Sequence, residues 1–326
     1  MAYQPASVQT GTASLTHLAT VWYDKVAVEN LKANLPFVAA TSRRKLPNRS
    51  GKTIQMFSYS LLAANTTPGS EGTVGVGIAP TTVNRSATVE QYFDFMSFSD
   101  ILDETAIDPI VENSAAEMGY RAALTANTLA RSEFETSGAA TDGRIDLSDN
   151  EFMSGSIVRQ AEMDLRSDEV RPGAGGLFFG IIHPFTAFDL LNDNTAGGVS
   201  DVLKRSESGA GELQRGIQGF RVAEFAGVRF IETNTTGSTA AFPSGAKVGY
   251  HTYVIGMDAI FTVSLGSTEI PQDRNFRLSV DRWSRSVSDP AGVIGATVAY
   301  NFRFAALRAP GAVNRLRQIR SETSIT

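Results

Sequence analysis

An alternation of side chains with a period of two marks three segments of the chain as β-strands, residues 52–59, 88–98 and 298–306. Side chains alternate between the two faces of a strand, so the pattern also separates the faces. In the first segment the two predicted sets are Ile54, Met56 and Ser58 on one face and Thr53, Gln55, Phe57 and Tyr59 on the other. The third segment has the cleanest period of two in the chain.

Between the first two strands lies a long excursion from Leu61 to Val83 that is rich in Gly, Ser and Thr. It contains four Gly, two Pro and a single charge, Glu71. Such a segment cannot bury enough apolar area to offset the entropy lost on ordering, and structureless loops of this length are uncommon within a compact domain. We therefore expect the excursion to be an arm that becomes ordered against another molecule.

A period of 3.6 residues predicts three helices. The first covers residues 21–37. The second covers residues 109–137 and starts at Asp108-Pro109, because Asp caps free N–H groups and Pro loses no hydrogen bond at the first helical position. It ends before Gly138, a residue that commonly stops a helix. The third begins at Ser148, where Ser148 and Glu151 have capping-box spacing, and extends to about residue 168.

The remainder of the chain alternates between short strands and one more helix. Residues 171–176 break the third helix, and residues 192–219 form a polar, Gly-rich loop. Residues 1–18 lack periodicity and are expected to be mobile or to lie on a neighbouring molecule. The predicted strands are 177–182, 220–222, 228–232 and segments within 250–265, and the predicted helix is 184–191. The fold class is therefore α+β.

Composition narrows the functional class. The 326 residues include 42% hydrophobic residues and no Cys, which excludes disulfides, thiolate nucleophiles and Cys-ligated metals. The net charge of −5 is unlike that of a dedicated nucleic-acid binder. Neither a signal peptide nor a membrane-spanning apolar run is visible, so we expect a soluble product and no membrane partner.

Charge is nevertheless sorted along the chain. All the charged residues within 43–52 are basic, and most of those within 100–135 are acidic. The charged residues near the C-terminus are mainly basic again. These blocks can be solvated surface, a basic arm lying on the acidic helix of another subunit, or phosphate contacts. The candidate contacts in the first two blocks are Arg43, Arg44, Lys45, Arg49, Glu112 and Glu117.

Catalytic motifs fail on inspection. Gly51-Lys52-Thr53 lacks the earlier glycine of a P-loop, because Leu46 stands there. His183 has no accompanying nucleophile motif and is interpreted as structural. The acidic residues of 100–108 could gather a divalent cation, but acids near helix N-termini are expected from the helix dipole alone. We predict no catalytic, metal or cofactor site.

Four segments resemble, in order and spacing, one family of tailed-bacteriophage major capsid proteins, which is similar to others with the Hong Kong 97 capsid fold. They are Tyr23-Asp-Lys-Val-Ala-Val-Glu-Asn-Leu-Lys-Ala-Asn-Leu-Pro-Phe37, Asn48-Arg-Ser-Gly-Lys-Thr-Ile54, Ala87-Thr-Val-Glu-Gln-Tyr-Phe-Asp94 and Ser99-Asp-Ile-Leu-Asp-Glu-Thr-Ala-Ile-Asp-Pro109. The resemblance covers about the first 140 residues and departs at Pro68-Gly-Ser-Glu-Gly-Thr-Val-Gly75.

The resemblance implies a division of the chain into five parts. These are an N-terminal arm (1–48), an extended β-hairpin loop (49–98), a peripheral domain (99–174) with a spine helix at 109–137, an axial domain (175–275), and C-terminal strands (276–326) that return to the peripheral domain. The apolar arm residues expected to anchor on a neighbour are Leu61, Leu62, Val74, Val76 and Ile78, with Glu71 as the charged contact.

The implied function is a major capsid protein that self-assembles, as hexamers and pentamers, into an icosahedral virion shell in the host cytoplasm. The shell encloses double-stranded DNA without sequence-specific binding. The implied partners are a separate scaffolding protein, a portal and a decoration protein. Two alternatives remain open: an encapsulin-like nanocompartment shell, and a hydrolase that uses His183.

Some relatives of this fold join subunits by an isopeptide bond between a Lys of the extended loop and an Asn of a neighbour. This chain has Lys only at positions 25, 32, 45, 52, 204 and 247. No Lys lies between Thr53 and Leu203, so the loop beyond its root cannot supply the amine. We therefore expect a shell held together without covalent cross-links.

Overall fold

The structure is a computed structural model in which the described residues are 36–47, 50–60, 62, 64–68, 72, 77–105, 110–135, 143–148, 151–193, 224–242, 247–265, 276–282, 294–311 and 315–325. Four predicted segments lie wholly or largely outside these residues: the N-terminal segment 1–18, the helix at 21–37, the loop at 192–219 and the strand at 220–222. The chain divides into two units, which are described separately. Unit 1 contains described residues of 36–52, 88–132 and 262–306, and unit 2 those of 53–87, 133–261 and 307–325.

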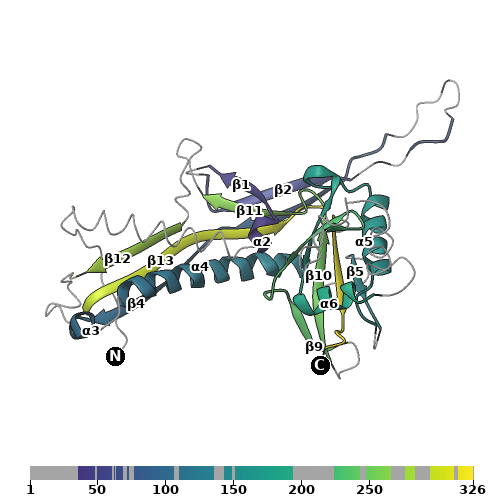
Figure 1. Cartoon of the computed structure of the whole chain (residues 1–326). Coiled ribbons are helices and arrows are strands. Elements are labelled where there is room, and N and C mark those ends of the chain that lie inside the picture. Colours follow the sequence, from purple (N-terminus) through teal and green to yellow (C-terminus); the bar gives the residue numbers. More distant parts are fainter. Residues whose placement is uncertain are drawn as a thin grey trace. The chain divides into compact units, whose positions relative to one another are not determined.

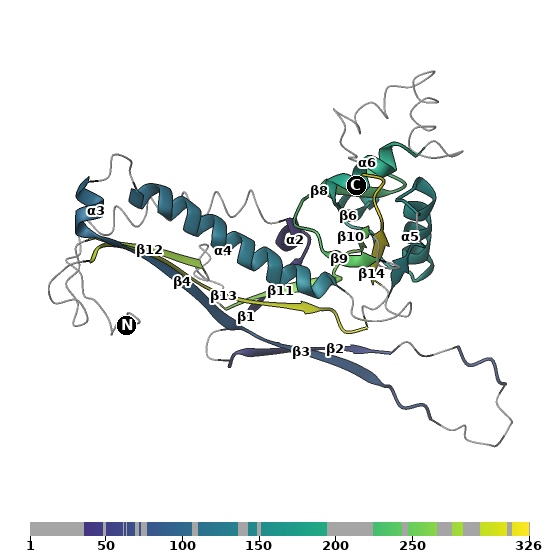
Figure 2. The same ribbon diagram turned by 90° about the horizontal axis from the view of Figure 1, so that it is seen from below.

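Unit 1 is built on a five-stranded sheet covered on one face by a long helix (Figures 1 and 2). Its strands have the order β1-β11-β13-β12, and β4 also pairs with β13. The elements are α2 (Pro36–Ala39), β1 (Ser42–Leu46), β4 (Glu90–Ser99), α3 (Asp100–Thr105), α4 (Ile110–Phe134), β11 (Ile260–Leu265), β12 (Phe276–Arg282) and β13 (Ile294–Arg308). The last residues of α4 and β13 and the first of β11 belong to unit 2.

Helix α4 confirms the predicted long helix. Its 25 residues correspond to a length of about 37 Å. Its apolar residues recur at the helical period and form its buried face, because Val111, Ala115, Met118 and Ala122 are each at most 1% exposed. Small Ala side chains let the helix approach the sheet closely. The helix ends at Phe134, three residues before the predicted end at residue 137. Arg308 Nη2 donates a hydrogen bond to the Glu133 carbonyl at 2.9 Å, which satisfies one of the free carbonyl groups of the last turn.

The core of unit 1 lies between α4 and the sheet. From β13, Val298, Tyr300 and Phe302 point into it and are at most 5% exposed, as the alternation predicts. Beyond Phe302 the alternation weakens, since Phe304 is only half-buried while Ala305 is buried. Antiparallel pairing sets Phe302 against Tyr92 of β4, with ring centroids 5.5 Å apart.

Unit 2 contains a seven-stranded mixed sheet with two helices on one face. The strand order is β5-β14-β10-β6-β8-β7, and β9 also pairs with β10. Its elements are β5 (Arg144–Asp146), α5 (Gly155–Ser167), a 3-10 turn (Ala174–Gly176), β6 (Phe178–Ile182), α6 (Pro184–Leu191), β7 (Glu224–Phe225), β8 (Val228–Glu232), β9 (Ser238–Phe242), β10 (Lys247–Ile255) and β14 (Leu316–Ser321). The predicted strands at 177–182 and 228–232 and the helix at 184–191 are confirmed.

The core of unit 2 joins α5 and α6 to the sheet. Val158, Ala161 and Leu165 of α5 are fully buried, at the spacing of one helix face. They pack in one cluster with residues of α6, β6 and β8, and with Ile319 of β14. The burial of a strand from residues 316–321 in this sheet was not foreseen.

One sequence prediction about unit 2 is wrong. Helix α5 begins at Gly155 and not at Ser148, because the chain before it pairs along β14, through β5 and a bridge between Phe152 and Glu322. The Ser148 and Glu151 pair does form, with Ser148 N–H donating to the Glu151 carboxylate at 2.8 Å, but it closes a turn and not a helix. The predicted end near residue 168 is confirmed, because Asp168 is the C-cap.

The C-terminal strands β13 and β14 join different sheets, and the return of residues 276–326 to the peripheral domain stays a prediction. Strand β13 joins the sheet of unit 1, whereas β14 lies between β5 and β10 in unit 2. Its six register pairs with β10 run antiparallel from Tyr250 opposite Ser321 to Ile255 opposite Leu316.

Candidate assembly surfaces

A two-stranded ribbon of β2 (Thr53–Tyr59) and β3 (Thr82–Thr88) is largely exposed and is seen in Figures 1 and 2. It confirms a hairpin over the root of the predicted arm. The returning strand is β3, however, and not the predicted 88–98 segment, because β4 pairs with β13 instead. The domain limits stated for the loop stay a prediction.

The two faces of β2 differ as the alternation predicts. Ile54, Met56 and Ser58 are half-buried, and Met56 packs on Phe261 and Ala309. On the opposite face Phe57 and Tyr59 are 63% and 64% exposed, with ring centroids 5.8 Å apart in an edge contact. An aromatic pair left this open on a narrow ribbon marks a surface for another molecule.

Exposed apolar side chains continue along the ribbon. Leu62 is 58% exposed, Ile78 65% and Val83 46%. Among the described residues from 53 to 88 the single charged side chain is Arg85. The predicted contacts Leu61, Glu71, Val74 and Val76 lie outside the described residues. The described part of the arm is therefore nearly uncharged and carries exposed apolar side chains among polar ones, and the role of Leu62 and Ile78 as anchors stays a prediction.

The predicted basic contacts lie on β1, at the edge of the sheet of unit 1. Arg43, Arg44 and Lys45 are all exposed, and alternation sends Arg44 to the opposite face from the other two. Arg49 lies outside the described residues. Consecutive cations on an edge strand also discourage unwanted strand pairing, so their exposure is consistent both with a contact and with that protective role.

The predicted acidic contacts lie on α4. Glu112 and Glu117 are exposed, while Arg121 pairs with Asp94 of β4 at 2.6 Å across the helix and sheet. Tyr120 and Leu124, 47% and 38% exposed, share the outward side of the helix. The exposed side of α4 is therefore mixed, with charges and apolar groups together.

Sequence reasoning missed the open face of β4. Phe93 is 70% exposed and Phe95 38%, and both point away from α4. Opposite them on β13 lie Asn301 and Ala299. The signal was present in the sequence, because β4 carries large apolar residues on both faces, with Tyr92 and Met96 alternating with Phe93 and Phe95. A strand with two apolar faces is expected to pack against other groups on both faces.

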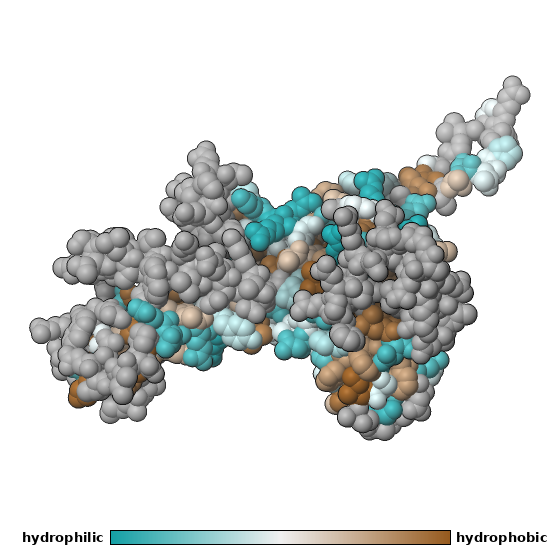
Figure 3. Space-filling model, viewed as in Figure 1, coloured by the Kyte–Doolittle hydropathy of each residue, from teal (hydrophilic) through white to brown (hydrophobic). Residues whose placement is uncertain are grey.

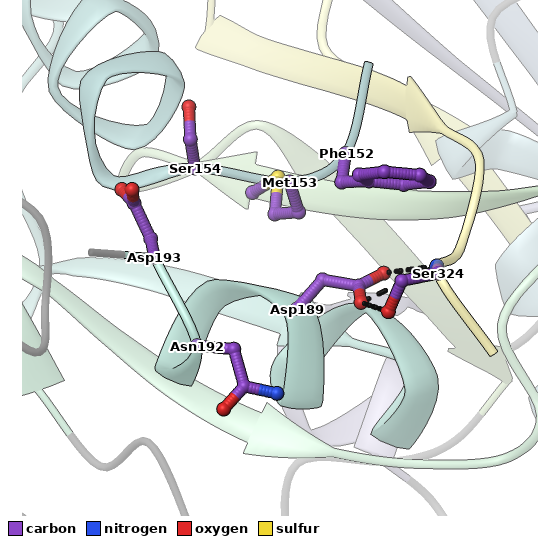
Figure 4. Close-up of a pocket in the computed structure, with 7 residues that line it drawn as sticks. All are labelled: Phe152, Met153, Ser154, Asp189, Asn192, Asp193 and Ser324. Atoms are coloured by element: carbon purple, nitrogen blue, oxygen red, sulfur yellow. Dashed lines mark hydrogen bonds between the residues drawn. The ribbon is translucent and has the colours of Figure 1, made fainter. Parts of the chain in front are cut away.

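A depression of about 310 Å³ in unit 2 contains two carboxylates, but both serve the fold (Figure 4). Asp189 accepts hydrogen bonds from the Ser324 N–H and from its hydroxyl, and so fastens the segment after β14 to α6. Asp193 Oδ2 accepts the Gly155 N–H at 2.8 Å and caps α5, whose own N-cap Ser154 makes no side-chain cap. The remaining lining residues are Phe152, Met153 and Asn192.

His183 has the structural role expected of it. Its Nδ1 accepts the Phe185 N–H at 3.2 Å, which caps α6 and leaves the proton of the neutral ring on Nε2. The ring stacks on Tyr250 with centroids 4.2 Å apart. Burial lowers the pKa of His183 below its usual value of 6.5, which favours the neutral ring. Because Nδ1 of His183 accepts the capping hydrogen bond, only Nε2 could take part in the hydrolase chemistry considered for this residue.

Other chemistry also lacks a site within the described part of the chain. Gly51 has a φ of +83° and leads into strand β2, whereas a P-loop leads into a helix. Over the same residues, no group of three or more metal-ligating side chains comes together. The carboxylates of residues 103–108 lie outside the side chains that can be described. None of the described helices has both the length and the hydrophobicity needed to cross a membrane.

Comparison with known proteins places the fold. No protein-family model and no curated protein sequence matches the chain. Several solved capsid structures do match. The capsid of Ralstonia phage GP4 aligns with a TM-score of 0.62 and 11% identity over 87% of each chain. The cyanophage Pam1 capsid aligns with 0.63 and 13% identity over 86% of this chain and 87% of that one. The mature capsid of bacteriophage PhiM1 aligns with 0.56 and 13% identity over 100% and 92%.

These likenesses establish the fold: the chain has the Hong Kong 97-type architecture of phage capsid proteins. The α+β class predicted from the sequence is confirmed, and so is the recognised fold.

Proposed function

We propose that the chain is a major capsid protein, which self-assembles into the icosahedral shell around the double-stranded DNA of a tailed phage. The observation that carries the proposal is the ribbon β2–β3. Its aromatic pair Phe57 and Tyr59 and its flanking Leu62 and Ile78 are more than half exposed, and this exposure is costly for a protein that stays monomeric. A shell subunit covers such an arm with its neighbours.

The chemistry of the ribbon supports a second copy of this chain as its partner. Among the described residues the arm carries one charge, Arg85, so it matches an apolar and weakly charged surface better than the mixed exposed side of α4. The open face of β4 has that character, with Phe93, Phe95 and the neutral Gln91 and Ser97. We infer that the apolar contact outweighs the predicted pairing of Arg43, Arg44 and Lys45 with Glu112 and Glu117, because exposed ion pairs contribute only about 0.2–1 kcal/mol each.

The partners expected of such a shell are a scaffolding protein, a portal and a decoration protein. Packaged DNA needs no specific site on the wall, and the acidic net charge of −5 keeps a polyanion from adhering to it. The carboxylates and His183 described above act in the fold, so the proposed role requires no catalysis.

Electron microscopy of the purified protein, alone and with candidate scaffolding proteins encoded beside its gene, tests the proposal. Polyhedral shells, or rings of five and six subunits, are expected. Nuclease-protected double-stranded DNA inside particles isolated from infected cells would distinguish a virion from a nanocompartment, which would hold a protein cargo. A strictly monomeric chain at high concentration, with every candidate scaffold present, would refute the proposal.

A further inference from the structure

Unit 2 carries an exposed apolar patch that the ribbon does not explain. Figure 3 shows brown, hydrophobic side chains gathered over α6 and over the sheet end at β9. Three large side chains there are well exposed: Phe185 at 39%, Phe188 at 46% and Val248 at 42%. Phe185 and Phe188 lie one turn apart on α6, and Val248 shares a face of β10 with Tyr250. We name Phe185, Phe188, Val248 and Tyr250 the α6 patch.

Two rings of the α6 patch, those of Phe185 and Tyr250, are held in place by contacts within the unit. The Phe185 ring meets Tyr250 edge to face at 5.5 Å, and His183 stacks on Tyr250 at 4.2 Å while it meets Phe185 at 4.9 Å. The cap from His183 Nδ1 to the Phe185 N–H fixes the start of the helix. Rigid aromatic side chains lose little entropy on binding, which is the property of residues that dominate interface energies.

A surface of complementary chemistry lies on α5 of the same unit. Met163 is 62% exposed in the middle of the outward side of the helix. One turn away on either side are Arg159, whose guanidinium lies 5.5 Å from the Phe225 ring centre, and Arg166, which pairs with Glu162 at 2.7 Å. We name Arg159, Met163 and Arg166 the α5 face. Thioether and guanidinium groups both bind aromatic rings favourably, and Met and Arg are enriched at interface centres.

We propose that the α6 patch of one copy packs against the α5 face of the next copy around a ring. The two surfaces differ, so the contact between them is heterologous, and heterologous contacts that close generate rings. A two-fold contact of the α5 face with itself, centred on Met163, would set Arg159 of one copy near Arg166 of the other, and this like-charge contact disfavours it. The inference rests on the proposed function, because it assigns one contact within the rings of a shell.

Cross-linking provides a direct test, because the chain has no cysteine of its own. The double variant Met163→Cys with Phe188→Cys is assembled and treated with a short bis-maleimide. A ladder of covalent multimers up to the full ring is expected, and each single-cysteine variant should give none. The matched control is Met257→Cys with Phe188→Cys, because Met257 is 54% exposed in unit 2 but belongs to neither surface.

Each outcome is decisive. Normal particles of the double variant without a ladder would overturn the contact and leave the proposed function standing. Cross-linked dimers from Phe188→Cys alone would show a two-fold contact of the α6 patch with itself and would also overturn it. If the unmodified chain forms neither rings nor shells with any candidate scaffold, the proposed function fails and the contact fails with it.

A charge exchange gives a second readout. Phe188→Lys alone and Met163→Glu alone should each weaken ring assembly roughly tenfold or more, since each places a charge in the contact. The two together should recover most of the loss, because the new charges face each other between copies. Met257→Glu serves as the control and should assemble normally. Equal loss in the double variant and the single variants, with all of them folded, would contradict the proposal.

Discussion

Strands β2 and β4 have the same alternating pattern, and each has one half-buried face that packs on its own chain and one exposed face. Tyr92 and Met96 of β4 pack under α4, whereas Phe57 and Tyr59 of the ribbon are more than 60% exposed. The pattern alone therefore identifies a strand but not what covers it. The difference separates residues that hold the subunit together from residues left for its neighbours.

The largest effect expected on the subunit itself follows from Phe302→Ala. Phe302 is 5% exposed and packs against Tyr92 and Tyr300 in the core of unit 1. Its truncation should lower the free energy of unfolding by about 3–5 kcal/mol, because it removes buried area and leaves a cavity. Denaturant unfolding monitored by circular dichroism measures the change. A loss below about 1 kcal/mol would mean that this face is not the covered one.

The matched change on the open face is Phe57→Ala with Tyr59→Ala. Each of the two substitutions should change the stability of the monomer by no more than about 0.5 kcal/mol. Assembly should fail, since each ring contributes about 1.5–3 kcal/mol if it becomes fully covered in the shell. Sedimentation and electron microscopy report assembly, and thermal unfolding reports the fold. Normal shells from this variant would show that the exposed aromatic pair has no partner.

A smaller effect is expected from reversing the charges of β1, through Arg43→Glu, Arg44→Glu and Lys45→Glu together. Each exposed pair contributes about 0.2–1 kcal/mol, so assembly should weaken but persist, and the defect should shrink as salt is added. Light scattering across a salt series measures this. Unchanged assembly at low salt would contradict the predicted pairing with Glu112 and Glu117. Complete failure of assembly at every salt concentration would show that this pairing contributes more to assembly than the ribbon does.

A weaker effect concerns pH. Burial lowers the pKa of His183 in the folded chain below its usual value of 6.5, so the unfolded chain takes up the proton first as pH falls. The stability that this residue contributes is therefore complete above about pH 6.5 and declines as pH falls below it. Unfolding at pH 8 and pH 5 should show a smaller pH-dependent loss in His183→Asn, which keeps a cap acceptor, than in the unmodified chain. Identical losses in both would contradict the assignment.

Mature particles boiled in detergent are expected to show no covalent cross-links between subunits. Lys is absent from Thr53 to Leu203, so the ribbon cannot supply the amine of an isopeptide bond. Gel electrophoresis should give a single band at 34.9 kDa. A ladder would show that one of the six lysines elsewhere is joined to a neighbour.

Local patterns in the sequence predicted much of the fold. The strands at residues 53–59 and 294–308 and the helices at 110–134 and 184–191 carry their own periodicity or caps, and the structure confirms them. The family resemblance supplied the architecture that those elements form. Where prediction failed, the cause was pairing between distant segments. The start of α5 is set by the pairing of residues 144–152 with 318–322, and no local signal at Ser148 could reveal that.

The candidate contacts were predicted less completely. Leu62, Ile78, Arg43, Arg44, Lys45, Glu112 and Glu117 are all exposed, but an exposed position in one subunit does not identify its partner. Phe93 and Phe95 were not among the predicted contacts, although β4 carries large apolar residues on both faces. The α6 patch was missed because its residues come from a helix and from a strand about sixty positions later.

The position of β14 has a consequence for how this protein is made. Residues 316–321 separate β5, at 144–146, from β10, at 247–255, so neither strand has its neighbour on that side until the ribosome has passed residue 321. Pairings so distant in sequence form slowly and leave strand edges open meanwhile. A nascent chain can complete the sheet of unit 2 only late in translation. The surfaces on α5 and α6 that depend on this sheet therefore mature late as well, which delays ring formation on polysomes, where partly made subunits are crowded together.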